Sequence, residues 1–163
     1  MSLMQYIAPQ RQQRAQHGAD KYHGDISANY DAKREGDPKW LLEQYWIETM
    51  LEDLPEGSGI LDIPCGTGRF FQFCGSKGFV VKALDVSTDQ LQQAANKLKA
   101  LHAQGLADGT KFRLAAGNVL KLGAPDKCVD ASVCCRLTRW LSPDENVTAF
   151  KELARVTRQR IVW

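Results

Sequence analysis

The sequence has no long apolar run and no marked excess of charge. Its apolar stretches stay well short of the ~18 residues that a membrane-spanning helix needs, and residues 1–16 lack the apolar segment of a secretory signal. The 21 basic and 19 acidic residues leave a net charge of +2, which is too balanced for a protein that binds nucleic acid mainly by electrostatic attraction. We therefore expect neither membrane insertion nor nucleic-acid binding.

Cysteine and histidine are sparse and do not form the patterns of metal sites. The five cysteines include no Cys-x-x-Cys pair, and the three histidines include no His-x-x-x-His pair. An odd number of cysteines does not complete a disulfide framework, and most of them lie in apolar runs, where thiols pack as small buried side chains. We expect no metal ion, and we expect a reducing, cytoplasmic location.

The chain has the length and composition of one globular domain. It contains 163 residues, of which 44% are hydrophobic and 25% charged. Residues 1–36 are polar and show no apolar periodicity, so they are expected to form a leader that is either loose or folded over something else, such as a bound ligand. Residues 37–163 are expected to form the core.

Strands and helices are predicted to alternate along this core. Asp37 and Pro38 suit the N-cap and the first turn of a helix that reaches about residue 54. Apolar patterns predict strands at 59–63, 79–84, 111–115, 129–134 and 159–163, and helices at 68–75, 88–104 and 143–157. This alternation predicts an α/β fold with a Rossmann-like, doubly wound, mainly parallel sheet of strand order 3-2-1-4-5. Ligands of such sheets bind at the carboxyl ends of the strands, here between the first and the fourth.

A glycine-rich turn follows the first predicted strand. The segment Asp62-Ile63-Pro64-Cys65-Gly66-Thr67-Gly68 places two glycines between a strand and a helix. The backbone can approach a ligand closely there, and the N–H groups at the start of the helix are unpaired. Asp85 ends the next strand, where an acid can accept hydrogen bonds from both hydroxyls of a ribose. The two features together indicate a cofactor that contains a nucleoside.

The turn differs from those that bind dinucleotides or phosphates. Phe71 stands at the third glycine position of the pattern Gly-x-Gly-x-x-Gly, which argues against NAD. The turn also lacks a lysine to neutralise a phosphate. The negative charge of Asp62 disfavours a phosphate and suits the amino group of an amino acid.

Over roughly residues 38–163 the chain resembles the class I S-adenosylmethionine-dependent methyltransferases. The first motif of that family is Asp/Glu-x-Gly-x-Gly-x-Gly, and residues 62–68 match it except at Pro64. Asp85 corresponds to the acid that binds the ribose. Asn118, between Gly117 and Val119, corresponds to the residue that meets the adenine amine. Residues 134–140 correspond to the loop that faces methionine and substrate.

This resemblance implies a set of binding residues for S-adenosylmethionine, with S-adenosylhomocysteine as the product. The expected cofactor-binding residues lie in the glycine-rich turn, after the second, third and fourth strands, and in the leader: Asp62, Pro64, Cys65, Gly66, Thr67, Gly68, Asp85, Val86, Asn118, Val119, Cys135, Tyr22, Tyr30 and Arg34. Arg136 and Arg139 are expected to bind an anionic group of the substrate. Arg69 opens a helix, where a cation is unfavourable, and is expected to face solvent or to approach the methionine carboxylate.

The expected reaction is methyl transfer to a small-molecule acceptor by in-line displacement, in which the protein mainly supplies proximity. No catalytic residue is identified. Two alternatives remain: an enzyme that uses the same cofactor for aminopropyl transfer or cofactor cleavage, and a non-catalytic module that binds a nucleoside or a partner. Because the family fold has seven strands, the sixth and seventh are missing here. We expect the chain to be a carboxyl-terminally truncated fragment, or else a homodimer or a partner to cover the edge of the fifth strand.

Overall fold

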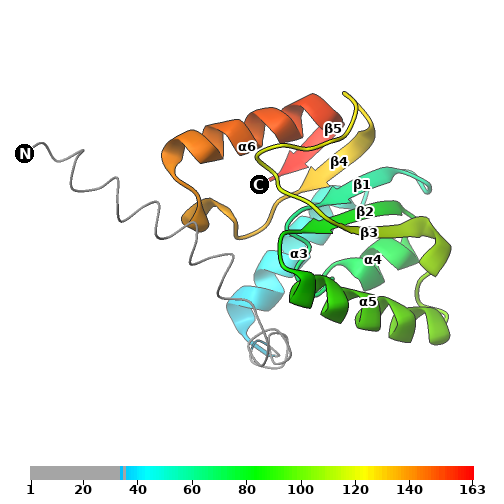
Figure 1. Cartoon of the computed structure of the whole chain (residues 1–163). Helices are drawn as coiled ribbons and strands as arrows, with labels where there is room; N and C mark the ends of the chain where they lie inside the picture. Colours follow the sequence, from blue (N-terminus) through cyan, green and yellow to red (C-terminus); the bar gives the residue numbers. More distant parts are fainter. Residues whose placement is uncertain (1–33, 35) are drawn as a thin grey trace, which may run out of the picture.

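The computed structural model describes residue 34 and residues 36–163, and within them it confirms the expected sheet (Figure 1). The described strands form one five-stranded sheet of order β3-β2-β1-β4-β5. Every neighbouring pair in it is parallel. Tyr22 and Tyr30 lie outside the described residues, so their expected contacts stay predictions. The division into a leader and a core also stays a prediction.

The strands and helices alternate as the sequence predicts. The strands are β1 (Gly59–Asp62), β2 (Val80–Asp85), β3 (Phe112–Ala116), β4 (Val129–Val133) and β5 (Thr157–Val162). The helices are α3 (Pro38–Leu51), α4 (Phe71–Ser76), α5 (Thr88–Ala103) and α6 (Pro143–Val156). Two short 3-10 helices that the sequence did not suggest, η1 (Gly109–Lys111) and η2 (Thr138–Trp140), precede β3 and α6.

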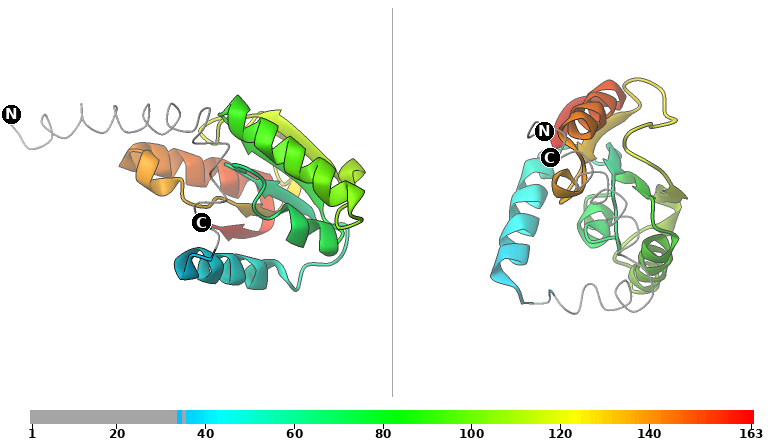
Figure 2. Two further views of the ribbon diagram at one scale, coloured as in Figure 1. Left: turned by 90° about the horizontal axis from the view of Figure 1, so that it is seen from below. Right: turned by 60° about the vertical axis from the view of Figure 1, so that its left-hand side comes forward.

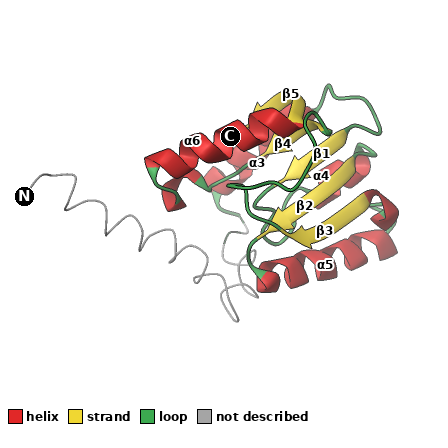
Figure 3. Cartoon of the chain, turned by 45° about the horizontal axis from the view of Figure 1, so that its top comes forward, coloured by secondary structure: helices red, strands yellow, loops and turns green. Residues whose placement is uncertain are grey.

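Helices lie on both faces of the sheet, and the central strands β1 and β4 are accordingly buried on both sides. Helix α6 lies above the sheet in Figure 1, and α4 and α5 lie below it. Ile60 of β1 belongs to the core shared with α3, α4 and α5, whereas its neighbour Leu61 belongs to the core shared with α6. Figure 3 shows the strands side by side, so their carboxyl ends form one edge.

Capping residues fix where three of the helices begin. The carboxylate of Asp37 accepts a hydrogen bond from the backbone N–H of Lys39, as expected for an N-cap. Ser87 caps α5 in the same way. Ser142 and Glu145 form a complete capping box at the start of α6. The caps thus fix the residues at which α5 and α6 begin after the loops that precede them.

Two element boundaries differ from the prediction for identifiable reasons. Helix α4 begins at Phe71 rather than at residue 68, because Gly66 and Gly68 have positive φ angles, which a right-handed helix does not allow. Strand β5 begins at Thr157, directly after α6, because Thr157 pairs with Val129 of β4; its hydroxyl also shares a buried 2.6 Å hydrogen bond with Ser132. The chain therefore turns from helix to strand without a linker.

Strand β5 forms one edge of the sheet and runs beside α3, as the left view of Figure 2 shows. The guanidinium group of Arg160 joins the two by bonding the carbonyl of Met50 and the carboxylate of Asp53. The outer side of α3 leaves large apolar residues exposed: Leu41, Leu42, Tyr45, Trp46 and Met50. None of the helices in the described part is long and apolar enough to cross a membrane.

Candidate cofactor site

A cavity of about 410 Å³ lies at the carboxyl ends of the strands. Its walls come from the loops after β1, β2, β3 and β4, from Trp40 of α3 and from the first turns of α5 and α6. This is the switch point between β1 and β4 at which the sequence predicts a ligand. The cavity brings together ten of the predicted site residues: Pro64, Cys65, Gly66, Thr67, Asp85, Val86, Asn118, Val119, Cys135 and Arg136.

Four other predicted residues lie outside the cavity wall. Asp62 and Gly68 are not among the residues that line the cavity, and Asp62 is buried. The guanidinium group of Arg139 stacks on Trp140, 5.1 Å from the ring centroid. That of Arg34 lies 5.5 Å from the ring centroid of Trp40.

The turn after β1 requires glycine at both predicted positions. Gly66 and Gly68 have φ angles of 54° and 78°, in the left-handed region that side chains rarely adopt. A Cβ atom on Gly68 would also lie 2.6 Å from the ring of Phe71. Phe71 is completely buried, so the residue at the third glycine position fills the space behind the turn. The turn thus opens its backbone toward the cavity and packs an aromatic ring on its other side.

Asp85 connects the turn after β1 with the start of α5. Its Oδ2 accepts a hydrogen bond of 2.8 Å from the N–H of Gly66, and its Oδ1 accepts one of 2.9 Å from the N–H of Ser87. Burial raises the pKa of Asp85, although these backbone hydrogen bonds oppose the rise. An ionised carboxylate has about four lone-pair sites, so the backbone does not use all of them and the carboxylate can still accept from a ribose.

Asp62 is a buried acid with an unsatisfied oxygen. Its side chain is 2% exposed, and the structure gives Oδ2 no hydrogen-bond partner. Burial, reinforced by the charge of Asp85 and opposed by Arg69, raises the pKa of Asp62 to about 8. A buried acid that lacks a full set of donors favours a nearby cation. This is consistent with the prediction that Asp62 supports an amino group.

Gln90 is a site residue that the sequence analysis missed. It lies in the first turn of α5, lines the cavity and is 3% exposed. Neither Nε2 nor Oε1 of its side chain has a hydrogen-bond partner in the structure. Unpaired buried amides are costly, so they often mark a place where a ligand supplies the missing partners. No sequence signal distinguishes Gln90 from the other glutamines of α5, because only the fold brings it to the cavity.

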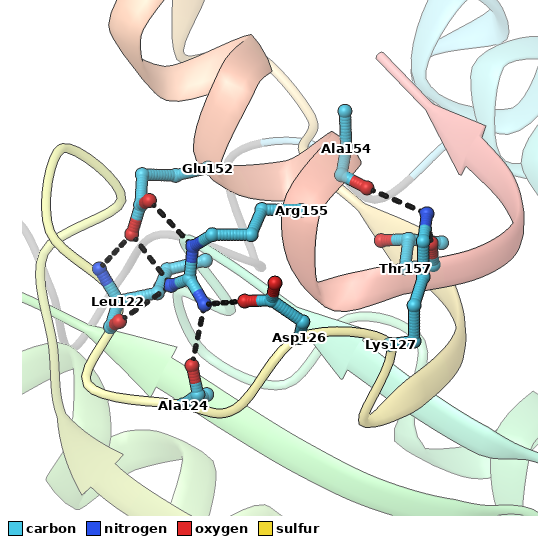
Figure 4. A network of polar contacts seen from close by, with 8 residues as sticks. All are labelled: Leu122, Ala124, Asp126, Lys127, Glu152, Ala154, Arg155 and Thr157. Atoms are coloured by element: carbon cyan, nitrogen blue, oxygen red, sulfur yellow. Dashed lines mark hydrogen bonds and ion pairs between the residues drawn. The ribbon is translucent and has the colours of Figure 1, made fainter.

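The loop after β3 carries Asn118 and Val119 to the cavity and is tied to α6. The side chain of Asn118 accepts a hydrogen bond from the N–H of Leu120, so it caps its own loop, and its contact with adenine stays a prediction. Farther along, Arg155 donates to the carbonyls of Leu122 and Ala124 (Figure 4).

Acidic residues complete this tie between the loop and α6. The carboxylate of Glu152 bonds Arg155 and also accepts the N–H of Leu122 at 2.8 Å. Asp126 bonds the same guanidinium group at 2.8 Å. The loop that forms one wall of the cavity is thus held at several points along its length.

A cluster of charged side chains surrounds Trp40 at the other end of the cavity. The guanidinium carbons of Arg69 and Arg136 lie 3.5 Å and 4.6 Å from the ring centroid of Trp40. Glu43 bridges the two arginines, with 2.6 Å to Nη1 of Arg69 and 2.8 Å to Nε of Arg136. This bridge joins α3 to the loop after β4.

For Arg69 the expectation of a solvent-facing side chain was wrong, whereas the alternative, an approach to the methionine carboxylate, stays a prediction, because Arg69 lines the cavity. Its side chain is only 9% exposed and does not face solvent. It bonds Glu43, the side chain of Gln44 and the carbonyl of Trp40. These partners on α3 compensate for a cation near the start of α4 and give Arg69 a structural role.

The remaining ionisable wall residues are not set up as nucleophiles. Burial raises the pKa of Cys65, and burial together with the charge of Glu43 raises the pKa of Cys135 to about 12. Both are therefore neutral thiols at physiological pH. Within residues 36–163 there is also no group of three or more His, Cys, Asp or Glu side chains arranged to hold a metal ion.

A parallel sheet of this order, with a glycine turn after β1 and an acid at the end of β2, defines a domain of the Rossmann-like class. Residues 60–160 match the family model described as "Methyltransferase domain". The chain belongs to this family.

The chain is similar to part of several known methyltransferases and related enzymes. A malonyl-[acyl-carrier protein] O-methyltransferase of Pectobacterium atrosepticum is 34% identical over 113 residues, which cover 68% of this chain and 40% of that protein. The structure of a SAM-dependent methyltransferase from Methanosarcina mazei is 29% identical with a TM-score of 0.58, covering 68% of this chain and 52% of the other. The [4+2]-cyclase SpnF shares the fold at 23% identity and a TM-score of 0.57, covering 69% and 40%. The chain thus spans about half or less of these proteins.

Proposed function

We propose that this chain binds S-adenosylmethionine in the cavity at the ends of β1 to β4 and takes part in methyl transfer to a small-molecule acceptor. The observation that supports this proposal most directly is the hydrogen bond from the N–H of Gly66 to Asp85. It places a carboxylate with spare lone pairs beside an open glycine turn. Membership in the methyltransferase domain family supports the same cofactor.

The proposed binding mode uses the whole length of the cavity. Asp85 accepts hydrogen bonds from the ribose hydroxyls, and the buried amide of Gln90 supplies further hydrogen bonds nearby. Asn118 and Val119 contact the adenine. The turn at Gly66 contacts the methionine part of the cofactor, and the buried charge of Asp62 stabilises its amino group. When bound, this cofactor supplies an electrophilic methyl group on a sulfonium.

The acceptor approaches from the side of Trp40 and Arg136 in this proposal. A small molecule suits a cavity of about 410 Å³ that also holds the cofactor. The Pectobacterium relative is named for a malonyl group on a carrier protein, which is consistent with a small acceptor group. The cytoplasmic location, and a second copy or a partner at the edge of β5, also stay predictions.

Calorimetric titration with S-adenosylmethionine and S-adenosylhomocysteine, with NAD as the control ligand, tests the proposal. We expect micromolar binding of the two sulfur nucleosides and none of NAD. Asp85→Ala should abolish binding. Asp85→Asn should weaken it while preserving the shape of the site, and denaturant unfolding should show that both variants fold. If the folded wild-type chain binds neither nucleoside, the proposal is wrong.

A further inference from the structure

The side-chain amide of Gln90 is a buried polar group that the protein itself does not satisfy. Gln90 is 3% exposed and lines the cavity, and neither its Nε2 nor its Oε1 has a hydrogen-bond partner among the described residues. Gln92, on the exposed side of the same helix, pairs with Asn96 at 3.2 Å. A buried amide without partners costs stability, and a ligand that supplies them removes this cost. Gln90 therefore points to a ligand in the cavity.

The amide of Gln90 lies beside the turn that Asp85 holds. Its Oε1 is 3.7 Å from the position that a Cβ atom on Gly66 would take. The N–H of Gly66 donates in turn to Asp85 at 2.8 Å. The backbone N–H of Gln90 donates to the hydroxyl of Ser87 at 3.3 Å, which fixes Gln90 in the first turn of α5. Because Gln90 and Asp85 both line the cavity and flank Gly66, they lie at the same end of it.

The carboxylate of Asp85 and the amide of Gln90 have complementary hydrogen-bonding roles. An ionised carboxylate only accepts, and the N–H groups of Gly66 and Ser87 beside it already donate to its two oxygens. A hydroxyl both donates and accepts, so one that donates to Asp85 still has oxygen lone pairs that need a donor. The amide of Gln90 offers donors on Nε2 and an acceptor on Oε1 that no described residue uses. The two side chains together thus match a hydroxyl in both of its roles.

We propose that Gln90 binds a ribose hydroxyl of the cofactor jointly with Asp85 and thereby selects ribosides over deoxyribosides. This inference rests on the proposed function and adds a specificity-determining residue to the same site. The hydroxyl donates a hydrogen bond to Asp85 and accepts one from Nε2 of Gln90. A ligand that lacks this hydroxyl leaves the buried amide without a partner, and a site built for hydrogen bonding discriminates strongly against such a ligand.

The edge of an adenine is the other nucleoside group that a glutamine amide can bind. Such an amide can form two hydrogen bonds, with N6 and N7 of the base. The ribose is the better match here because Gln90 adjoins Gly66, which Asp85 bonds. Asn118 and Val119, the residues expected to contact the adenine, belong to the loop after β3. Ligands that lack single atoms of the ribose or of the adenine distinguish the two partners.

The experiment removes one hydrogen-bonding group at a time from the ligand and from the protein. The ligands are S-adenosylhomocysteine, its 2′-deoxy and 3′-deoxy analogues, and its 7-deaza analogue, which lacks N7 of the adenine. Each is titrated calorimetrically into the 163-residue wild-type chain and into Gln90→Met and Gln90→Leu. Gln92→Met is the matched control, because Gln92 is exposed on the same helix. Denaturant unfolding shows whether each variant folds, and the dissociation constants do not depend on turnover.

We expect the loss of a ribose hydroxyl to matter less once the amide of Gln90 has been removed. At least one deoxy analogue should bind the wild-type chain about 10- to 100-fold more weakly than S-adenosylhomocysteine, as for the loss of hydrogen bonds that include a charged group. In Gln90→Met and Gln90→Leu this ratio should fall at least about fivefold, because only Asp85 still responds to the hydroxyl. The ratio for the 7-deaza analogue should be the same in all four proteins, and Gln92→Met should behave as wild type.

The outcomes separate this inference from the proposed function. If the folded wild-type chain does not bind S-adenosylhomocysteine, the proposed function is wrong. If it binds that nucleoside and both deoxy analogues equally tightly, only the Gln90 inference is wrong, whether or not the variants fold. Equal deoxy ratios in wild type and in a folded Gln90 variant also overturn it. A Gln90 variant that changes the 7-deaza ratio in place of the deoxy ratios would assign the amide to the adenine and would overturn it as well.

Discussion

The carboxylate of Asp85 bonds the N–H of Gly66 at 2.8 Å, and this bond joins the end of β2 to the turn after β1. The residue predicted to bind a ribose therefore also shapes the turn that faces the rest of the ligand. Because both carboxylate oxygens are used by the backbone, the site is preorganised before a ligand arrives. Four predictions follow from how the surrounding residues are held.

Replacement of Gly68 by alanine should destabilise the protein more than the same replacement at a left-handed glycine with open space around it. The new Cβ atom meets the ring of Phe71 at 2.6 Å, in addition to the strain of a φ angle of 78°. Gly105→Ala is the matched control, because Gly105 has a φ angle of 70° but open space around its Cβ position. Denaturant unfolding should show a loss for Gly68→Ala that exceeds the control by more than about 1 kcal/mol. Equal losses would mean that Phe71 moves aside without cost.

Replacement of Gln90 by methionine should stabilise the free protein and weaken nucleoside binding. The unpaired buried amide costs about 1–3 kcal/mol in the free protein, and methionine fills a similar space without polar atoms. The free energy of unfolding and the affinity for S-adenosylhomocysteine should therefore change in opposite directions. Gln92→Met on the exposed side of α5 should change neither appreciably. If the Gln90→Met variant binds the nucleoside as tightly as wild type, Gln90 does not contribute to nucleoside binding.

Asp62 should make the stability of the free protein fall as the pH rises from about 4 to about 8. The folded protein keeps a proton on Asp62 up to a pKa of about 8, whereas the unfolded chain loses it near 3.8. Unfolding therefore releases this proton within that window, and higher pH favours the unfolded state. Asp62→Asn removes the effect, so its advantage over wild type should grow to more than about 1 kcal/mol at pH 8, since one pKa unit corresponds to about 1.4 kcal/mol. Parallel stability curves for the two proteins would contradict the elevated pKa.

Arg155 should influence nucleoside binding even though it lies outside the cavity wall. Its guanidinium group bonds the carbonyls of Leu122 and Ala124, and lysine cannot replace this fork of donors. Arg155→Lys should speed hydrogen exchange in residues 118–127 and lower the affinity for S-adenosylhomocysteine several-fold. Arg158→Lys is the control, because Arg158 pairs with Asp130. Faster exchange with unchanged affinity would show that the loop adapts to the ligand without this support.

Much of the fold could be predicted from the sequence because its signals are local. Asp37 and Pro38 mark the start of α3, and the alternation of apolar runs gives the parallel sheet and its order. The positions of the turn and of Asp85 also follow, since each stands at the end of a strand. The larger boundary errors have two sources: the left-handed backbone of the glycine turn delays α4, and the pairing of Thr157 with Val129 of β4 starts β5 early.

The environment of the site residues could not be predicted in the same way. Arg69 was expected to face solvent, but α3 supplies Glu43 as a partner that is 26 residues away in the chain. Gln90 was missed because its unpaired state depends on how α5 packs against the turn. Such features depend on long-range packing, which apolar periodicity does not encode.

The position of Trp40 has a spectroscopic consequence. Two of the four tryptophans of the chain, Trp40 and Trp140, line the cavity, whereas Trp46 and Trp163 are 52% and 41% exposed. Because Trp40 is stacked with Arg69, its emission responds to changes in the nearby charge and solvent. The protein therefore carries a built-in fluorescent reporter of what enters its cavity. Replacement of both Trp46 and Trp163 by phenylalanine would leave only the two tryptophans that line the cavity to emit.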